Sequence, residues 1–150
     1  MHNPLSTMKI RALSPSNTFG MVRTKDGKPR AHQGWDLAAP VGTPVYAITS
    51  GLVRDVRDAG DYGIQISLEF QRDKQIMYAF YAHLSRVVCA EGQNVCEGTL
   101  LGFTGRTGNA KHTAPHLHFE IRKGGLHPGK GLHGRIDPGE VLGYTVYSSQ

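Results

Sequence analysis

The chain has 150 residues, enough for one domain with a buried core. Its 19 glycines and 8 prolines predict many turns, and it lacks the run of about 18 apolar residues that a membrane-spanning helix needs. The formal net charge of +5 suits an anionic partner, such as a nucleic acid, an acidic membrane surface or an anionic cell-wall polymer. The basic residues are scattered and no aromatic-basic RNA motif occurs, so we expect no nucleic-acid partner.

The N-terminal residues 1–18 contain prolines, serines and asparagines that predict an irregular lead-in, followed by one domain over residues 19–150. The first residues lack a charged start, an apolar core and a small-residue cleavage site, so no signal peptide is expected. Either a signal has been removed, or the protein is exported by another route, or it stays inside the cell.

Alternation of apolar and polar residues predicts a mainly β fold with antiparallel hairpins and no long helix. In the strand that ends near Leu84, we expect Met77, Ala79, Tyr81 and His83 on one face. The Gly-, Lys- and His-rich stretch 123–138 reads as an irregular excursion that lines a groove. The expected strands cover residues 44–49, 52–57, 64–70, 75–84, 99–105 and 116–121.

The segment 116–121 carries the strongest chemical signal. As a strand, it places Leu117, Phe119 and Ile121 on a core face. The other face then carries His116, His118 and Glu120. There one imidazole can bind a metal while its neighbour accepts and donates protons. The alternative is a half-exposed strand that carries histidines without a function.

Three further residues are candidates for the same chemistry. An extended backbone puts His32 and Asp36 on one face, and both residue types bind divalent metals. Considered alone, this pair fits a surface contact or a buried hydrogen bond equally well. His83, considered alone, fits a structural histidine near a strand end.

The two cysteines, Cys89 and Cys96, flank a turn that would form a short hairpin. A disulfide between them would imply an oxidising compartment. Two unpaired cysteines are the alternative, because sequence does not fix the bond geometry. Their spacing matches no CxxC zinc or redox motif.

Taken together, the motifs resemble the M23 (lysostaphin/LytM-like) zinc metallopeptidases, which cleave peptide cross-links of bacterial peptidoglycan. The resemblance covers residues Phe19 to Leu142. It implies a small antiparallel β-sheet with a substrate groove across it. The motifs that carry it are His32-Gln-Gly-Trp-Asp36-Leu-Ala-Ala-Pro, Tyr81-Ala-His83-Leu-Ser and Pro115-His-Leu-His-Phe-Glu120.

The resemblance also implies roles for single residues. His32, Asp36 and His118 match the three ligands of one Zn²⁺ per chain, and His83 and His116 match the two catalytic histidines. Three protein ligands leave a fourth position for water, whose pKa zinc lowers to about 7. The two catalytic histidines would share base, acid and oxyanion-stabilising duties in an undetermined division.

No cysteine nucleophile is needed for this chemistry, so Cys89 and Cys96 fit better as a structural pair. The chain departs from the family pattern in its loops. The loop before His116 is about two residues longer than usual, Ala114 stands where glycine is common, and residues 124–137 are long and basic. These changes leave the substrate preference open. A carboxylate-bearing peptide stem is a reasonable ligand, because Gly-rich and basic loops flank the site.

The leading hypothesis is a zinc metalloendopeptidase that cuts peptidoglycan stem peptides or cross-links, acting in the periplasm or at the cell wall. A non-catalytic LytM-like binding or amidase-activating module is the alternative, although the five filled positions argue against it. A basic β-domain that binds nucleic acid is a third reading. The lack of a visible signal fits a bacteriolytic toxin or effector, or a phage component. We expect a monomer, with a cognate inhibitor or immunity protein as a candidate partner.

Overall fold

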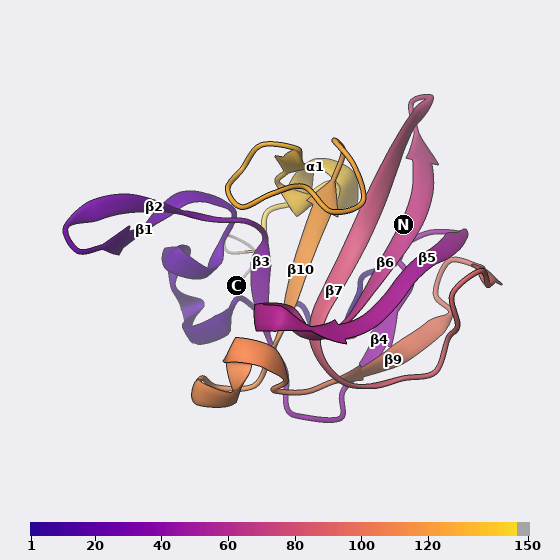
Figure 1. The fold of residues 1–150 in the computed structure, drawn as a ribbon, viewed down its shortest axis with the longest axis horizontal. Helices are drawn as coiled ribbons and strands as arrows, with labels where there is room; N and C mark the ends of the chain where they lie inside the picture. The colour runs from indigo at the N-terminus through magenta and orange to yellow at the C-terminus, as the bar shows by residue number, and fades with distance from the viewer. Residues whose placement is uncertain (147–150) are drawn as a thin grey trace.

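Antiparallel strands are the main regular structure of the computed structural model, which describes residues 1–146 (Figure 1). This confirms the expected mainly β fold. The strands are β1 (Gly20–Lys25), β2 (Lys28–His32), β3 (Trp35–Ala38), β4 (Pro44–Tyr46), β5 (Gly51–Ala59), β6 (Gly63–Arg72), β7 (Gln75–Val87), β8 (Asn94–Val95), β9 (Leu100–Thr104), β10 (His116–Arg122) and β11 (Arg135–Ile136). The 3₁₀ turns are η1 (Arg11–Leu13), η2 (Pro15–Asn17), η3 (Gly60–Tyr62) and η4 (Gly108–His112), and α1 spans Pro138–Leu142.

Helical structure is short, as expected from the sequence. Asp137 caps α1 by accepting a hydrogen bond from the Gly139 amide at 2.9 Å, Pro138 takes its first position, and Gly143 ends it in a left-handed conformation. Within residues 1–146, no helix is long and apolar enough to cross a membrane.

Strand β10 lies in the interior of a nine-stranded sheet whose main order is β11-β10-β7-β6-β5-β8. It pairs with β7 along one edge and with β3 and β11 along the other. β9 joins the sheet by pairing with β7 and with β4. Because β10 is hydrogen-bonded on both edges and buried over its whole length, its side chains are held in fixed positions.

The two faces of β10 differ in chemistry. Leu117, Phe119 and Ile121 are fully buried in the hydrophobic core, where the Phe119 ring lies 5.2 Å from that of Tyr81. The opposite face carries His116, His118 and Glu120, which are also buried. The predicted alternation is therefore confirmed, whereas the alternative of a half-exposed strand is wrong.

The N-terminal segment is irregular but packs onto the sheet. Leu5 and Ile10 belong to the buried core. The amide of Ala38 donates to the carbonyl of Lys9 at 2.8 Å, and the amide of Tyr46 donates to the carbonyl of Pro4 at 2.9 Å. Residues 1–10 thus cover the edges of β3 and β4.

Strands β1 and β2 form a separate two-stranded sheet that projects from the body of the molecule (Figure 1). The hairpin is largely exposed along β1 and up to the last residues of β2. Its base, at His32, is buried. The hairpin therefore stands beside the face of the sheet that carries the histidines.

Cys89 and Cys96 are both free thiols, Cys89 half-buried and Cys96 exposed. The short hairpin that was expected to bring them together does not form, and a disulfide between Cys89 and Cys96 stays a prediction. Instead, β8 pairs with β5, and the chain around Val87 pairs with β9. The two cysteines therefore follow different neighbours in the sheet.

Candidate functional site

Three predicted metal ligands converge where β2, β3 and β10 meet. Asp36 lies opposite His118 in the β3–β10 register. Its Oδ1 is 2.8 Å from His118 Nδ1 and 3.2 Å from His32 Nε2. All three side chains are buried, and their ligand atoms lie within 4.8 Å of one another. They form a compact set of two nitrogens and one carboxylate oxygen.

Gly34 makes the spacing between His32 and Asp36 possible. A Cβ added at Gly34 would lie 2.1 Å from the carbonyl oxygen of Phe119. Only a residue without a side chain lets the backbone cross this close to β10. The sequence His-x-Gly-x-Asp therefore folds both ligands against the strand that supplies the third.

Backbone carbonyls orient three of the histidines. The Nδ1 atoms of His32, His83 and His116 lie 2.8, 2.8 and 2.9 Å from the carbonyl oxygens of Thr18, Thr107 and Ala114. A carbonyl oxygen only accepts hydrogen bonds, so each Nδ1 is the protonated nitrogen. Each Nε2 is therefore left with a lone pair to bind a metal or to take a proton.

His118 is held from the other side. Its Nε2 lies 2.7 Å from Oε2 of Glu120, which is fully buried. A carboxylate accepts, so this nitrogen donates and Nδ1 faces Asp36. Such a carboxylate behind a ligating imidazole fixes the tautomer and the ring orientation of the ligand.

Glu120 is the centre of a buried polar network. Its Oε1 accepts from Nε of Arg122 at 2.9 Å and from Nε of Arg135 at 2.6 Å. Tyr62 donates to its Oε2 at 3.1 Å. The Arg122 guanidinium also stacks 3.7 Å from the centre of the Phe80 ring. Two cations, a phenol and an imidazole thus share one carboxylate.

His83 reaches the site through a β-bulge. Between the pairs Ile66–Tyr81 and Ile64–Leu84, β7 contains one residue more than β6. His83 takes a left-handed φ of 61°, and Leu84 returns to the core. Bulges of this kind re-aim a side chain and are common beside active sites.

The expectation that His83 shares a face with Met77, Ala79 and Tyr81 is therefore wrong. The bulge turns its ring to the other side, where its centre lies 5.0 Å from that of His116 and 6.0 Å from that of His118. A non-glycine residue in this backbone region costs about 1–3 kcal/mol. The surrounding strands hold it there.

The charges at the site separate the histidines into two kinds. Burial favours a neutral Asp36, but its contacts with the His118 and His32 imidazoles outweigh burial and hold the pKa of Asp36 well below its usual range. Burial also opposes a charged His118, yet bonds to Asp36 and Glu120 raise its pKa to about 9. The position between these two carboxylates thus stabilises a positive charge.

His83 and His116 are neutral at neutral pH. Burial lowers the pKa of His83 to about 4, and the rings of His118 and His116 act in the same direction. Burial also lowers the pKa of His116. The Nε2 of His116 lies 3.8 Å from Asp36 Oδ1, so a neutral ring borders the three-ligand cluster.

An open groove of about 750 Å³ runs over the cluster. One wall is the loop between β10 and β11, which contributes Pro128 to Gly131, as expected for the stretch 123–138. The side chain of Gln33 accepts from the Gly131 amide at 2.6 Å, and Nη1 of Arg135 donates to the carbonyls of Gly129 and Gly131. The network around Glu120 therefore also anchors this wall.

Two arginines that the sequence did not single out contact Asp36. Arg23 lies 3.0 Å and Arg11 3.5 Å from its Oδ2, on the side away from the histidines. Both also donate to Oδ1 of the buried Asn17. No periodicity links residues 11, 17, 23 and 36, so only the folded chain reveals this contact.

The donor set fits a zinc ion. Zinc takes histidine nitrogens and carboxylate oxygens in a tetrahedron, with ligand atoms about 3.3 Å apart. The distance of 3.2 Å between His32 Nε2 and Asp36 Oδ1 agrees with this spacing, and the stabilised positive charge agrees with a cation. Three ligands would leave one position facing the groove.

Comparisons with known proteins agree with this site. The model of peptidase family M23 matches residues 30–129. The DD-carboxypeptidase/endopeptidase Mpg of Neisseria meningitidis serogroup B is 42% identical over 96 residues, 64% of this chain and 21% of that protein. The peptidoglycan DD-endopeptidase ShyC of Vibrio cholerae is 35% identical over 122 residues, 81% of this chain and 27% of that protein.

Solved structures give the same picture. The catalytic domain of the antimicrobial peptidase lysostaphin from Staphylococcus simulans is 29% identical, with a TM-score of 0.68 over 85% of this chain and 90% of that one. By contrast, the chain spans only 21% and 27% of the length of the two curated relatives.

Proposed function

Because the chain belongs to peptidase family M23, we propose that it is a zinc-dependent endopeptidase that hydrolyses peptide bonds in bacterial peptidoglycan. The observation that carries the proposal is the cluster of His32, Asp36 and His118, with the Nε2 atoms of two neutral histidines beside it. Relatives named as peptidoglycan DD-endopeptidases support the choice of substrate.

His32 Nε2, Asp36 Oδ1 and His118 Nδ1 would hold the zinc ion. When bound, zinc supplies a Lewis acid that polarises the scissile carbonyl and acidifies a water. Glu120 keeps the His118 ring in the tautomer that presents Nδ1. The Thr18 carbonyl accepts from Nδ1 of His32 and so keeps that ring in the tautomer that presents Nε2.

His83 and His116 would move the protons. Their Nδ1–H groups are engaged with Thr107 and Ala114, so each ring presents Nε2 to the groove. A neutral Nε2 can take a proton from the attacking water and return it to the leaving amine. After protonation, the same ring can donate a hydrogen bond to the oxyanion. The two residues share these duties in this proposal.

The groove is open enough for an extended peptide, which fits an endopeptidase. Peptidoglycan lies in the periplasm and cell wall, so this is where we place the action. The roles of bacteriolytic toxin or effector, a cognate inhibitor and a monomeric state stay predictions.

The test is to measure zinc content and the cleavage of purified peptidoglycan for the same set of variants. We expect about one zinc per wild-type chain, and loss of both zinc and activity in His118→Ala. His83→Gln and His116→Gln should keep zinc while activity falls by about 10²–10⁴-fold. His133→Gln, an exposed loop histidine outside the groove, is the control and should change neither.

Two results would overturn the proposal. A folded wild-type protein without zinc would remove the ligand assignment. A zinc-loaded protein that cuts no peptidoglycan would point instead to a non-catalytic LytM-like module. Circular dichroism of each variant separates loss of function from loss of fold.

A further inference from the structure

We propose that Arg11, Arg23 and Arg30 form a subsite that binds a free carboxylate of the peptide substrate, on the residue at the cleaved bond or next to it. The inference rests on the proposed function and deepens it, because it names a substrate class: acidic peptides rather than neutral ones. These three residues are called the arginine subsite below.

The three arginines come from separate segments and meet at one place. Arg11 lies in η1, Arg23 in β1 and Arg30 in β2. All three line the groove over the metal-binding cluster, and all three also line a second hollow that adjoins it. The fold therefore gathers guanidinium groups at one end of the groove.

Their charges are only partly neutralised. The single carboxylate of Asp36 faces both Arg11 and Arg23, and its other oxygen faces His32 and His118. In the part of the chain that the structure describes, Arg30 forms no ion pair, while Arg11 and Arg23 share the one carboxylate of Asp36. The three guanidinium groups thus keep a net positive charge beside the groove.

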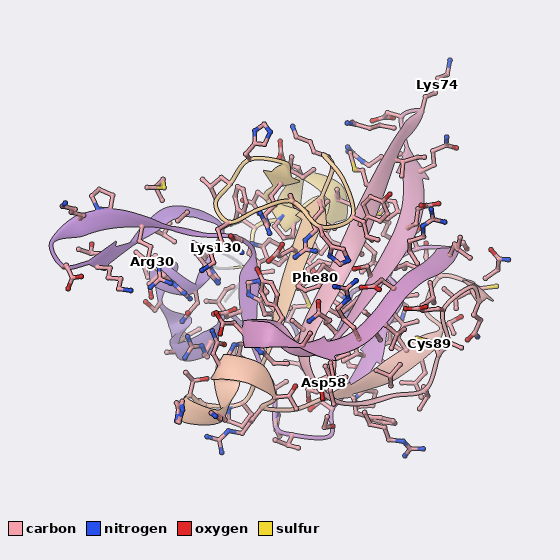
Figure 2. All side chains as sticks on the ribbon, viewed as in Figure 1. Arg30, Asp58, Lys74, Phe80, Cys89 and Lys130 are labelled. Atoms are coloured by element: carbon pink, nitrogen blue, oxygen red, sulfur yellow. The ribbon has the colours of Figure 1, made fainter. Side chains whose placement is uncertain are left out.

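A lysine of the loop between β10 and β11 adds to the same field. Lys130 is exposed on the loop between β10 and β11 and lines the same groove as Arg30. Figure 2 shows Arg30 along the β1–β2 hairpin and Lys130 near the point where the hairpin joins the body of the molecule. The other acidic residue that lines the groove is the exposed Asp61. A negatively charged substrate would therefore meet several cations in the groove.

A guanidinium is suited to a carboxylate because its planar fork makes two parallel hydrogen bonds. The position of Arg23 also shows how far a bound carboxylate would lie from the proposed zinc site. Its Nη2 is 3.0 Å from Asp36 Oδ2, which shares the Cγ atom with Oδ1, the proposed zinc ligand atom. A peptide residue spans about 3.3–3.6 Å. A carboxylate held there therefore belongs to a residue at the cleaved bond or to its neighbour.

The test compares cleavage of acidic and neutral forms of one substrate. Soluble cross-linked peptides released from peptidoglycan are used with free carboxylates or after conversion of the carboxylates to carboxamides. We expect the zinc-loaded enzyme to cleave the acid form with at least tenfold higher kcat/KM, mainly through a lower KM. Arg30→Gln should reduce that preference by about tenfold and retain its zinc, since Arg30 contacts no ligand.

Arg54→Gln is the matched control. Arg54 is an exposed arginine of β5 that pairs with Glu69, outside the groove. This variant should keep the wild-type preference. A binding measurement supplements the kinetics: calorimetry of the zinc-loaded enzyme with the cleaved peptides, acid or amidated, should show the same preference and the same loss in Arg30→Gln.

The outcomes separate this inference from the proposed function. Equal cleavage of the acid and amide forms, or an unchanged preference in Arg30→Gln, would refute the arginine subsite and leave the peptidase intact. If the enzyme cleaved neither form, the proposed function would fail, and calorimetry would still decide whether the arginines prefer the acid. Tighter binding of a short polyphosphate than of the acid peptides would overturn the assignment to a carboxylate.

Discussion

Replacing Glu120 by alanine removes a carboxylate that five neighbouring side chains contact. Arg122 and Arg135 would lose their counter-charge while 2% and 5% exposed. His118 and Tyr62 would lose the oxygen to which they donate. The variant tests whether this buried network stabilises the fold and the metal-binding cluster together.

The structure sets the size of the effect. Removing one partner of a buried ion pair costs about 3–5 kcal/mol, because an uncompensated charge stays buried. Two arginines are affected here, but both keep backbone acceptors: Arg122 the carbonyl of Leu126, and Arg135 the carbonyls of the groove wall. We therefore expect about 3–5 kcal/mol in total. In a domain of this size, this lowers Tm by about 6–20 °C.

Urea and thermal unfolding of the metal-free protein, followed by circular dichroism, measure this cost. The matched control is Glu69→Ala, which removes the pair between the half-buried Glu69 of β6 and the exposed Arg54 of β5, 3.7 Å apart. Exposed pairs contribute about 0–1 kcal/mol, so the control should be near neutral. A loss below about 1 kcal/mol in Glu120→Ala, equal to that of the control, would refute the reasoning.

The milder change Glu120→Gln tests the link to the metal. The amide keeps an oxygen for the network but loses the charge behind His118. Loss of such a supporting carboxylate costs about 10–100-fold in metal affinity. Competition with a chelator measures the zinc affinity, and an unchanged value would show that Glu120 does not position His118.

Three further predictions concern other parts of the chain. Burial raises the pKa of Tyr81 above its usual range, so its phenol ionises only in the unfolded chain; stability should be intact below about pH 10 and fall above it by up to about 1.4 kcal/mol per pH unit. Urea unfolding at pH 9 and pH 11 should show this loss in wild type but less of it in Tyr81→Phe, and equal losses would contradict it. Gly34→Ala should cost at least about 2 kcal/mol and reduce zinc content, because its Cβ meets the Phe119 carbonyl; Gly129→Ala, which has open space, is the control in both assays. When free zinc is a thousandfold above its Kd, bound zinc should add about 4 kcal/mol to the free energy of unfolding. Removing the zinc should therefore lower the Tm in calorimetry, and an unchanged Tm would argue against a bound ion.

Much of the site could be predicted because its residues follow simple periodicities. The period of two in β10 placed His116, His118 and Glu120 on one face, and the structure agrees. The prediction that His32 and Asp36 share a face was right in outcome, but they come within 3.2 Å because the chain leaves β2 and enters β3 between them, at Gly34. These relations are local or follow from regular strand geometry.

The remaining features depend on tertiary contacts that leave no periodic signal. A bulge breaks the alternation at His83, and no residue in the strand marks it. Arg135 follows a long loop, so the sequence does not predict its bond to Glu120. Arg122 lies two residues after Glu120 in the same strand, so the alternation does place it on the same face. The turn between Cys89 and Cys96 indicated a hairpin, but β8 pairs with β5 instead.

The order of the strands has a consequence for when the protein becomes active. Asp36 and His118 are 82 residues apart in the chain and become neighbours only when β3 and β10 pair. An unfolded chain has no such site, since closing so long a loop is entropically unfavourable until the sheet holds it. Under the proposed function, a chain that is still unfolded would therefore lack the site that cuts peptides. Pairing of β3 with β10 would be the step that completes it.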